Sequence, residues 1–144
     1  MKVIDLNLLL YAVNRDSPQH AAGRSWLEES LSGEEPVGFP WAVLFGFLRL
    51  TTSARVFQRP LVPEQAVEIV GWLARPHAVP LAPGERHWEI LRRLIASAGT
   101  GGNLTTDAHL AALAIEHDAD LYSTDADFGR FATLRWVNPL AGSA

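Results

Sequence analysis

Acidic residues next to predicted strands and helices are the part of this sequence most able to do chemistry. Asp5 directly follows a short predicted strand at 2–4, and Asp125 directly follows another. Asp107 lies in the first turn of a predicted helix, and Asp127 lies two residues after Asp125. Carboxylates brought close together repel one another unless a cation neutralises them, and Mg²⁺ and Mn²⁺ prefer oxygen ligands. Such an ion activates water and stabilises charge on a phosphoryl group, so these residues indicate phosphoryl chemistry.

Charge is unevenly distributed along the chain. Residues 103–129 contain six acids and no lysine or arginine, whereas residues 36–63 contain three arginines and no acid. Arginine suits phosphate oxygens, so Arg49, Arg55 and Arg59 are candidates for phosphate contacts, for a partner contact or for a solvated face. Each aspartate taken alone is equally explained as a residue of a turn or a helix start. Their combination is more specific.

The elements that must position these acids are short strands alternating with helices. Strands are predicted at 2–4, 79–81, 119–124 and 134–137. This alternation favours parallel pairing in an α/β sandwich, with the proline-flanked strand 79–81 at an edge. Ligand sites in such sheets collect at the carboxyl ends of strands, where Asp5 and Asp125 would converge.

Helix start signals separate these strands. The helix beginning at Pro40 is apolar almost all round, so it is either deeply buried or packed against another subunit. Tryptophans at helical apolar spacing are expected in the core, namely Trp26, Trp41, Trp72 and Trp88. The other helices are predicted to begin at Ser17, Pro63, Glu85 and either Thr105 or Thr106.

Composition excludes several classes of protein. A chain of 144 residues with 48% hydrophobic residues is expected to form one domain, residues 1–144. It has no cysteine, which excludes disulfide scaffolds, thiolate zinc sites and cysteine nucleophiles. A net charge of −4 argues against binding a duplex through bulk positive charge. The opening residues turn polar at Asp5 and no apolar run approaches a membrane span, so a cytoplasmic location is expected.

Five segments, in order along nearly the whole chain, resemble one family. Val-Ile-Asp-Leu-Asn-Leu-Leu-Leu-Tyr at 3–11 resembles the first motif of PIN domains, Asp-x-Asn after a strand. The segment at 106–114 is similar to their helix-borne acid, and that at 121–128 to their closing strand and acidic turn. Phe-Leu-Arg-Leu-Thr-Thr at 47–52 and Trp-Val-Asn-Pro-Leu at 136–140 resemble the VapC-type toxin branch. Each motif is weak alone, and the ordered set is specific.

This resemblance implies a PIN-like three-layer α/β/α sandwich with a short, mostly parallel central sheet. It implies a metal-dependent endoribonuclease toxin in which Asp5, Asp107 and Asp125 hold Mg²⁺, or Mn²⁺. Asp127 would lie nearby, and Asn7 would fix the Asp5 loop. Water activated by the metal would attack an RNA phosphodiester in line. The implied partners are the RNA substrate, a VapB-like antitoxin and a second copy of the chain in a homodimer, with no membrane involved.

One departure from the family pattern concerns the helix that begins at Pro40. The family usually places a glutamate just before the Phe-Leu-Arg run, where this chain has Gly46, and residues 36–63 contain no acid that could replace it. Asp127 or water would have to substitute. We hypothesise that Gly46 leaves room for RNA or for an antitoxin side chain.

Two other functions stay open at this point. A PIN-like module that has lost efficient cleavage and acts through antitoxin or RNA binding is supported by the missing glutamate. A phosphotransferase or phosphatase on the same α/β plan is disfavoured, because Asp5 is followed by Leu6 and Asn7 rather than by a second aspartate two residues on. The histidines do not form a metal motif, and His109 is expected to be packed or hydrogen-bonded on its helix face.

Overall fold

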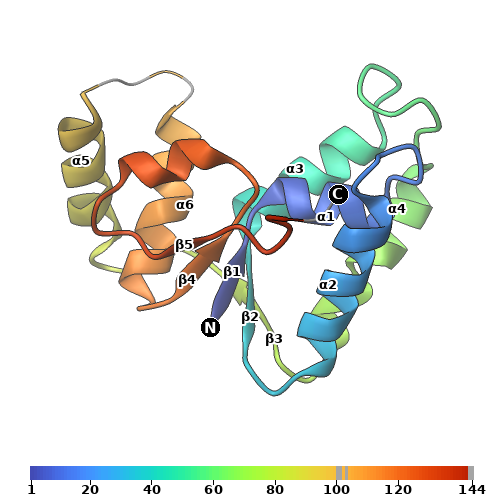
Figure 1. Cartoon of the computed structure of the whole chain (residues 1–144), viewed down its shortest axis with the longest axis horizontal. Coiled ribbons are helices and arrows are strands. Elements are labelled where there is room, and N and C mark those ends of the chain that lie inside the picture. The colour runs from blue at the N-terminus through green and yellow to red at the C-terminus, as the bar shows by residue number, and fades with distance from the viewer. Residues whose placement is uncertain (100–101, 103, 143–144) are drawn as a thin grey trace.

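A five-stranded sheet lies at the centre of the computed structural model, which describes residues 1–99, 102 and 104–142 (Figure 1). Its order is β3-β2-β1-β4-β5, and every strand pairing in the described residues is parallel. The α/β class with a short, parallel central sheet is therefore confirmed. The strands are β1 (Lys2–Ile4), β2 (Val37–Pro40), β3 (Ala78–Leu81), β4 (Asp120–Tyr122) and β5 (Trp136–Val137).

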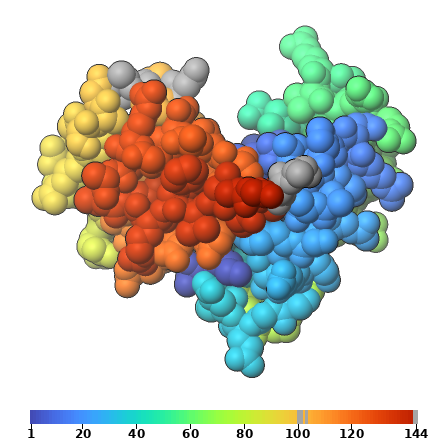
Figure 2. Space-filling view, in the orientation of Figure 1, coloured from blue at the N-terminus to red at the C-terminus, as the bar shows by residue number. Residues whose placement is uncertain are grey.

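Helices lie on both sides of this sheet. Figure 1 shows α5 and α6 on one side and α1 to α4 on the other, which gives the three layers expected of a PIN-like sandwich. In the space-filling view a notch separates the orange C-terminal segments from the green region of α3 and α4 (Figure 2). The helices are α1 (Leu6–Val13), α2 (His20–Ser32), α3 (Trp41–Thr51), α4 (Pro63–Ile69), α5 (His87–Ala98) and α6 (Leu104–Glu116), with 3₁₀ turns η1 (Val70–Ala74) and η2 (Ala126–Arg130).

Strand β2 was not expected from the sequence. It contains a glycine and a proline, both disfavoured in strand interiors, yet it lies between β1 and β3 with all four residues buried. Gly38 explains the exception, because a Cβ atom there would lie 2.6 Å from Leu81 Cδ1 and 3.0 Å from Met1 Sδ. With glycine at 38, the ends of the Leu81 and Met1 side chains pack directly on the backbone of β2. The predicted edge position of the 79–81 strand is confirmed, since β3 ends the sheet.

Helix α1 was also missed, because the apolar run after Asp5 has no helical periodicity that marks one face. The helix begins immediately after β1, and Asp5 is its N-cap, with Oδ1 accepting a hydrogen bond of 2.7 Å from the backbone N–H of Leu6. Asp5 therefore caps the turn after its strand, as any aspartate at a strand end can. It does not exclude a second role for the other carboxylate oxygen.

Helix boundaries differ from the prediction at several starts, and α5 begins at His87 rather than at Glu85. Helix α2 begins at His20 rather than at Ser17, whose hydroxyl accepts a hydrogen bond of 3.2 Å from the N–H of Gln19 in the preceding turn. Helix α6 begins at Leu104, so Thr105 and Thr106 lie inside its first turn and neither is its cap. The residue before Leu104 lies outside the described residues.

Two of the four tryptophans expected in the core are exposed. Trp26 stacks on Tyr122 with ring centroids 5.5 Å apart, and Trp72 packs edge-on against Phe47 at 5.1 Å. Trp41 and Trp88, by contrast, are 43% and 68% exposed. Helix α3 buries only one side, and its other side leaves an apolar surface in the single chain.

Helix α6 is held against the α5 region by polar contacts at its middle and at its C-terminal end. His109 Nδ1 lies 2.9 Å from Nε2 of the buried His87, so the expected hydrogen-bonded role of His109 is confirmed. At the C-terminal end of α6, both carboxylate oxygens of Glu116 accept backbone hydrogen bonds, from Gly84 at 2.8 Å and Arg86 at 3.0 Å. These contacts fix the position of the helix that carries Asp107. No helix within the described ranges is long and apolar enough to cross a bilayer.

Candidate metal centre

The neighbouring strands β1 and β4 bring two predicted site residues to the same edge of the sheet. Ile4 is in register with Tyr122, and the backbone N–H of Asp5 donates to Tyr122 O at 3.0 Å. The chain after β4 then turns at Asp125, which caps η2 by accepting a hydrogen bond of 2.9 Å from the N–H of Asp127. The carboxyl ends of these two parallel strands therefore place their acids together, as the sequence predicted.

Three carboxylates form a tight cluster at this edge. Asp107, Asp125 and Asp127 each offer one oxygen, and these oxygens all lie within 4.8 Å of one another. It is the one group in the described part of the chain that brings at least three potential metal ligands this close. The sequence prediction grouped Asp5 with Asp107 and Asp125 and gave Asp127 a supporting place. In the structure Asp127 is a member of the cluster, and Asp5 lies beside it.

The electrostatics of the cluster indicate that it is short of positive charge. Burial first, and then the charges of Asp125, Asp5 and Asp127, raise the pKa of Asp107 from 3.8 to about 6. Among the described residues the cluster has an ion pair with Arg130, whose Nε lies 4.0 Å from Asp127 Oδ1 with both side chains about half exposed, so it compensates little. A site of clustered carboxylate oxygens with raised pKa and weak compensation fits a divalent cation that prefers oxygen ligands.

Asp5 is held by one buried serine that the sequence did not single out. The Ser123 hydroxyl donates to Asp5 Oδ2 at 2.7 Å. Its oxygen accepts from Asn7 Nδ2 at 3.2 Å and from the backbone N–H of Asp125 at 3.0 Å. A hydroxyl has one donor and two acceptor positions, so Ser123 is fully used in joining these three residues. Burial raises the pKa of Asp5, and the hydrogen bonds from Ser123 and Leu6 act in the opposite direction.

Asn7 reaches the site through this serine rather than through Asp5 itself. Its Nδ2 donates to Ser123 Oγ, because the serine's single proton is already given to Asp5. Asn7 Oδ1 is consequently left buried without a hydrogen-bond partner. A buried, unsatisfied oxygen beside acidic groups is costly unless a cation or water meets it, which is a second observation that fits a metal at this edge.

A small cavity opens beside Asp5 and Asp107. Its volume is about 210 Å³, and Thr106 and Leu110 of α6 form part of its wall. On the α3 side, Ala42 and Val43 line it, together with Leu6 of α1. The cavity is therefore acidic at one end and apolar along its sides.

The position of the missing glutamate is filled from α1. A Cβ atom on the buried Gly46 would lie 2.7 Å from Leu6 Cδ2, so the leucine side chain occupies the space that a side chain at 46 would need. An incoming group at Gly46 would therefore have to displace the end of the Leu6 side chain, and the hypothesis that Gly46 makes room for one stays a prediction. Helix α3 faces the site with apolar groups only.

Ser123 gives a direct test of how this site is held together. Ser123→Ala removes one donor and two acceptor positions and leaves an Asp5 oxygen, the Asn7 amide and the Asp125 N–H without their partner. We expect the free energy of unfolding to fall by about 1–3 kcal/mol and Mn²⁺ affinity to fall about 10- to 100-fold. Chemical denaturation and isothermal titration with Mn²⁺ measure the two effects. Ser30→Ala, at another buried serine, is the control, and equal Mn²⁺ affinity in both variants would contradict the role of Ser123.

Comparison with known proteins agrees with this architecture. A profile of the PIN domain matches residues 2–134. Ribonuclease VapC37 of Mycobacterium tuberculosis is 50% identical over 142 residues, which cover 98% of this chain and 99% of the relative. Ribonuclease VapC33 of the same species is 45% identical over 141 residues, which cover 97% of this chain and 99% of the relative. Among solved structures, VapBC2 from Rickettsia felis bound to a promoter DNA fragment superposes with a TM-score of 0.65 at 18% identity, covering 95% of this chain and 97% of that chain. Mycobacterium tuberculosis VapC20, a sarcin-ricin loop cleaving toxin, superposes with a TM-score of 0.66 at 16% identity, covering 93% and 96%. The chain belongs to the PIN domain family, in its VapC group.

Proposed function

We propose that this protein is a VapC-type toxin of a type II toxin–antitoxin system, an endoribonuclease that hydrolyses RNA phosphodiester bonds in the cytoplasm. The observation that carries the proposal is the cluster of Asp107, Asp125 and Asp127 beside Asp5, at the carboxyl edge of the sheet. Relatives named VapC ribonucleases, similar along almost the whole chain, supply the reaction class.

In this proposal Asp5, Asp107 and Asp125 hold Mg²⁺ or Mn²⁺, and Asp127 adds a fourth carboxylate. When bound, the ion supplies activation of water and stabilisation of negative charge on the phosphate. The chain's own residues position these groups: Ser123 orients Asp5, the Asp125 cap fixes the loop to Asp127, and the contacts of α6 fix Asp107. The serine at the site, Ser123, is fully buried and its hydroxyl holds Asp5, so no covalent intermediate is part of the proposal.

The test is RNA cleavage by the purified protein after removal of antitoxin. Total cellular RNA is incubated with Mg²⁺ or Mn²⁺, or with EDTA, and the cut ends are mapped by sequencing. We expect discrete cuts with metal and none with EDTA. Absence of cuts with either ion, from a folded protein that still binds its antitoxin, would contradict the nuclease proposal.

A second candidate function has one specific observation in its favour. Leu6 fills the place of the family glutamate at Gly46, so α3 brings no acid to the site. A PIN-like module with weak cleavage, acting through antitoxin or RNA binding, would have this feature. The same cleavage assay separates the two, because the module binds its partner without producing metal-dependent cuts.

The proposed protein partner is a VapB-like antitoxin. Several structures with the same fold are toxin–antitoxin complexes, among them VapBC-1 of Haemophilus influenzae with a TM-score of 0.66 at 17% identity, covering 96% of this chain and 97% of that chain. The acidic cluster beside the cavity suits a basic side chain of a partner. We therefore place the antitoxin contact next to Asp107 and the apolar wall formed by α3.

We further propose that the exposed side of α3 forms a homodimer. Trp41 and Phe45 lie on this side with ring centroids 5.8 Å apart, and Phe45 is 63% exposed. Phe45→Lys is expected to weaken dimerisation at least about tenfold, because burial of one phenylalanine is worth more than 1.4 kcal/mol. Sedimentation equilibrium measures the change. Trp88→Lys, at an equally exposed aromatic residue on α5, is expected to leave the dimer intact, and equal effects of the two variants would contradict the assignment.

A further inference from the structure

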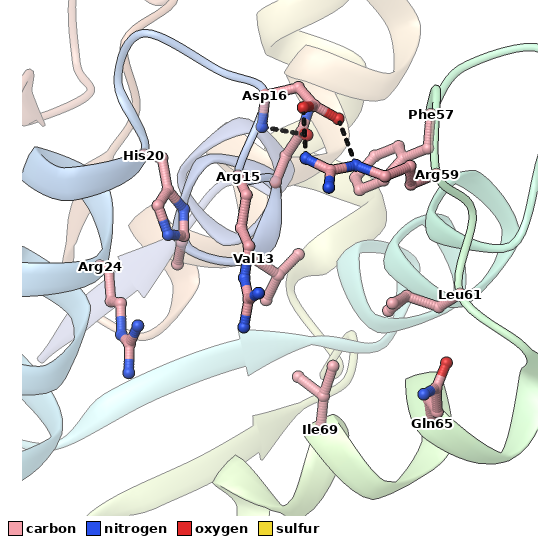
Figure 3. Close-up of a pocket in the computed structure, with 12 residues that line it drawn as sticks. Val13, Arg15, Asp16, His20, Arg24, Phe57, Arg59, Leu61, Gln65 and Ile69 are labelled. Carbon is pink, nitrogen blue, oxygen red and sulfur yellow. Dashed lines mark hydrogen bonds and ion pairs between the residues drawn. The ribbon is translucent and has the colours of Figure 1, made fainter.

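A second cavity lies at the other end of α1 from Asp5. Its volume is about 500 Å³, and it is bordered by the end of α1, the start of α2 and the segment that leads into α4 (Figure 3). Four of its lining side chains are basic or can become so, and we call it the arginine pocket: Arg15, His20, Arg24 and Arg59. A cavity of this size is in the range that accommodates a small ligand or one unit of a polymer.

Charge in the arginine pocket is not balanced. Asp16 is the single acid that lines it, and this carboxylate is already paired with Arg59 through contacts of 2.6 and 3.4 Å. The backbone N–H of Asp16 is in turn held by Asn14 Oδ1 at 3.1 Å. The side chains of Arg15 and Arg24 are exposed, and neither makes an ion pair or hydrogen bond with any described residue. Two uncompensated guanidinium groups in one concave site predict an anionic ligand, and their planar forks suit phosphate.

The opposite wall of the arginine pocket is apolar. Figure 3 shows Phe57, Leu61 and Ile69 facing the side from which His20 and Arg24 project. Phe57 is only 5% exposed, so it forms a fixed wall. An anion-binding side and an apolar side in one cavity match the two halves of a nucleotide, whose phosphate is charged and whose base presents an apolar face.

The close crossing of α1 and α2 assembles the basic side. A Cβ atom at Gly23 would lie 2.8 Å from Tyr11 Cβ and 3.4 Å from the backbone nitrogen of Ala12, so glycine is required where the helices meet. His20 is held by a contact of 2.9 Å between its Nδ1 and the Tyr11 carbonyl, which can only accept. Arg24 follows one turn later on α2. Its position beside the end of α1 is thus a property of the fold.

We propose that the arginine pocket binds one nucleotide of the RNA strand away from the bond that is cut, with its phosphate on Arg15 and Arg24 and its base against the half-buried Leu61 and Ile69. This inference rests on the proposed nuclease function. Helix α1 has eight residues and a length of about 12 Å, so at about 3.4 Å per stacked nucleotide roughly four nucleotides or fewer span the distance from Asp5. The acidic cluster repels RNA phosphates, and a cationic pocket nearby holds the strand in spite of that repulsion.

The test is RNA binding as a function of salt, with EDTA present so that cleavage does not interfere. The variant is Arg15→Gln with Arg24→Gln, and the matched control is Arg92→Gln with Arg93→Gln on α5, which removes the same charge where both arginines pair with Glu89. Fluorescence anisotropy with a single-stranded RNA of 12 nucleotides gives the affinity. We expect at least about tenfold weaker binding for the pocket variant and a log–log salt slope smaller by about 1.4, which is about 0.7 for each lost phosphate contact.

Further arms separate this inference from its alternatives. Arg15→Lys with Arg24→Lys is expected to recover most of the affinity and all of the salt slope, which a misfolded variant would not do. The inference is overturned if the pocket variant binds RNA like the control, or if it loses only antitoxin affinity, which would assign the pocket to a protein partner. A mixture of nucleoside monophosphates that occupies the pocket without displacing RNA overturns it as well.

The outcome is independent of the outcome for the nuclease proposal. If the pocket variant cleaves RNA as the parent does, the inference about the pocket is contradicted and the nuclease proposal stands. If the pocket variant binds RNA more weakly but neither it nor the parent cuts RNA, the inference about the pocket is supported and the nuclease proposal is contradicted.

Discussion

Asp107→Asn is expected to lower the rate of RNA cleavage by at least about 100-fold while the protein stays folded. Loss of an outer-shell partner already costs a metal site about 10- to 100-fold, so loss of a direct carboxylate ligand costs more. In the absence of metal the substitution removes a charge that Asp125, Asp5 and Asp127 repel. The melting temperature of the metal-free protein is therefore expected to stay equal or rise. Cleavage rates with Mn²⁺ and thermal melting in EDTA measure the two effects.

A matched control separates the loss of a ligand from the loss of a charge. Asp118→Asn makes the same chemical change beyond the other end of α6, at a residue whose side chain is 91% exposed. Its backbone φ of 50° is a conformation that asparagine adopts readily. We expect near-parental cleavage from this variant. Equal cleavage rates for Asp107→Asn and Asp118→Asn would contradict the assignment of Asp107 as a metal ligand.

Acidification is expected to weaken binding of the divalent cation by about tenfold per pH unit below about pH 6. The reason is that Asp107 has a pKa of about 6, so a proton competes with the cation for this carboxylate in the mildly acidic range. Titration of Mn²⁺ by calorimetry between pH 5 and 7.5 measures the slope. A cation affinity that is flat across this range would contradict the assignment of Asp107 as a ligand.

The same group sets the sign of a change in stability without metal. The pKa of Asp107 in the folded protein, about 6, is above its ordinary value of 3.8, so the folded state binds the proton more tightly than the unfolded chain. The stabilisation that proton binding to Asp107 gives the folded state is complete below about pH 4 and is lost as the pH rises to about 6. We expect the free energy of unfolding of Asp107→Asn, measured with denaturant in EDTA, not to show the decrease between about pH 4 and 6 that Asp107 gives the parent. An identical pH profile for parent and variant would contradict it.

The convergence of the acids was predictable because it follows from the rules of parallel sheets. Asp5 and Asp125 each follow a strand, and β1 and β4 are neighbours with their carboxyl ends at one edge. Asp107 was predictable from its place in the first turn of a helix. The sequence did not reveal that Asp127 approaches the cluster more closely than Asp5 does, because the direction of a side chain in a loop depends on local hydrogen bonds such as the Asp125 cap.

The features that the sequence did not predict depend on contacts between distant segments. Ser123 is a small polar residue in an apolar strand, and its role appears only when Asp5 and Asn7 lie beside it. Strand β2 has a sequence that disfavours strands, and it is held by pairing with both β1 and β3, where the side chains of Leu81 and Met1 pack on Gly38. Exposure of Trp41 was not predictable either, since helical spacing does not say how many sides of a helix are covered.

The link between Asp5 and Ser123 has a consequence for the synthesis of a toxic protein. These residues are 118 positions apart in the chain, and β1 acquires its neighbour β4 only when nearly the whole sequence is available. A nascent chain on the ribosome can form α1, α2 and the β1–β2 pair, yet it lacks both Ser123 and three of the four aspartates. Translation products that end before Asp107 lack the whole acidic cluster and are therefore expected to be unable to cut RNA.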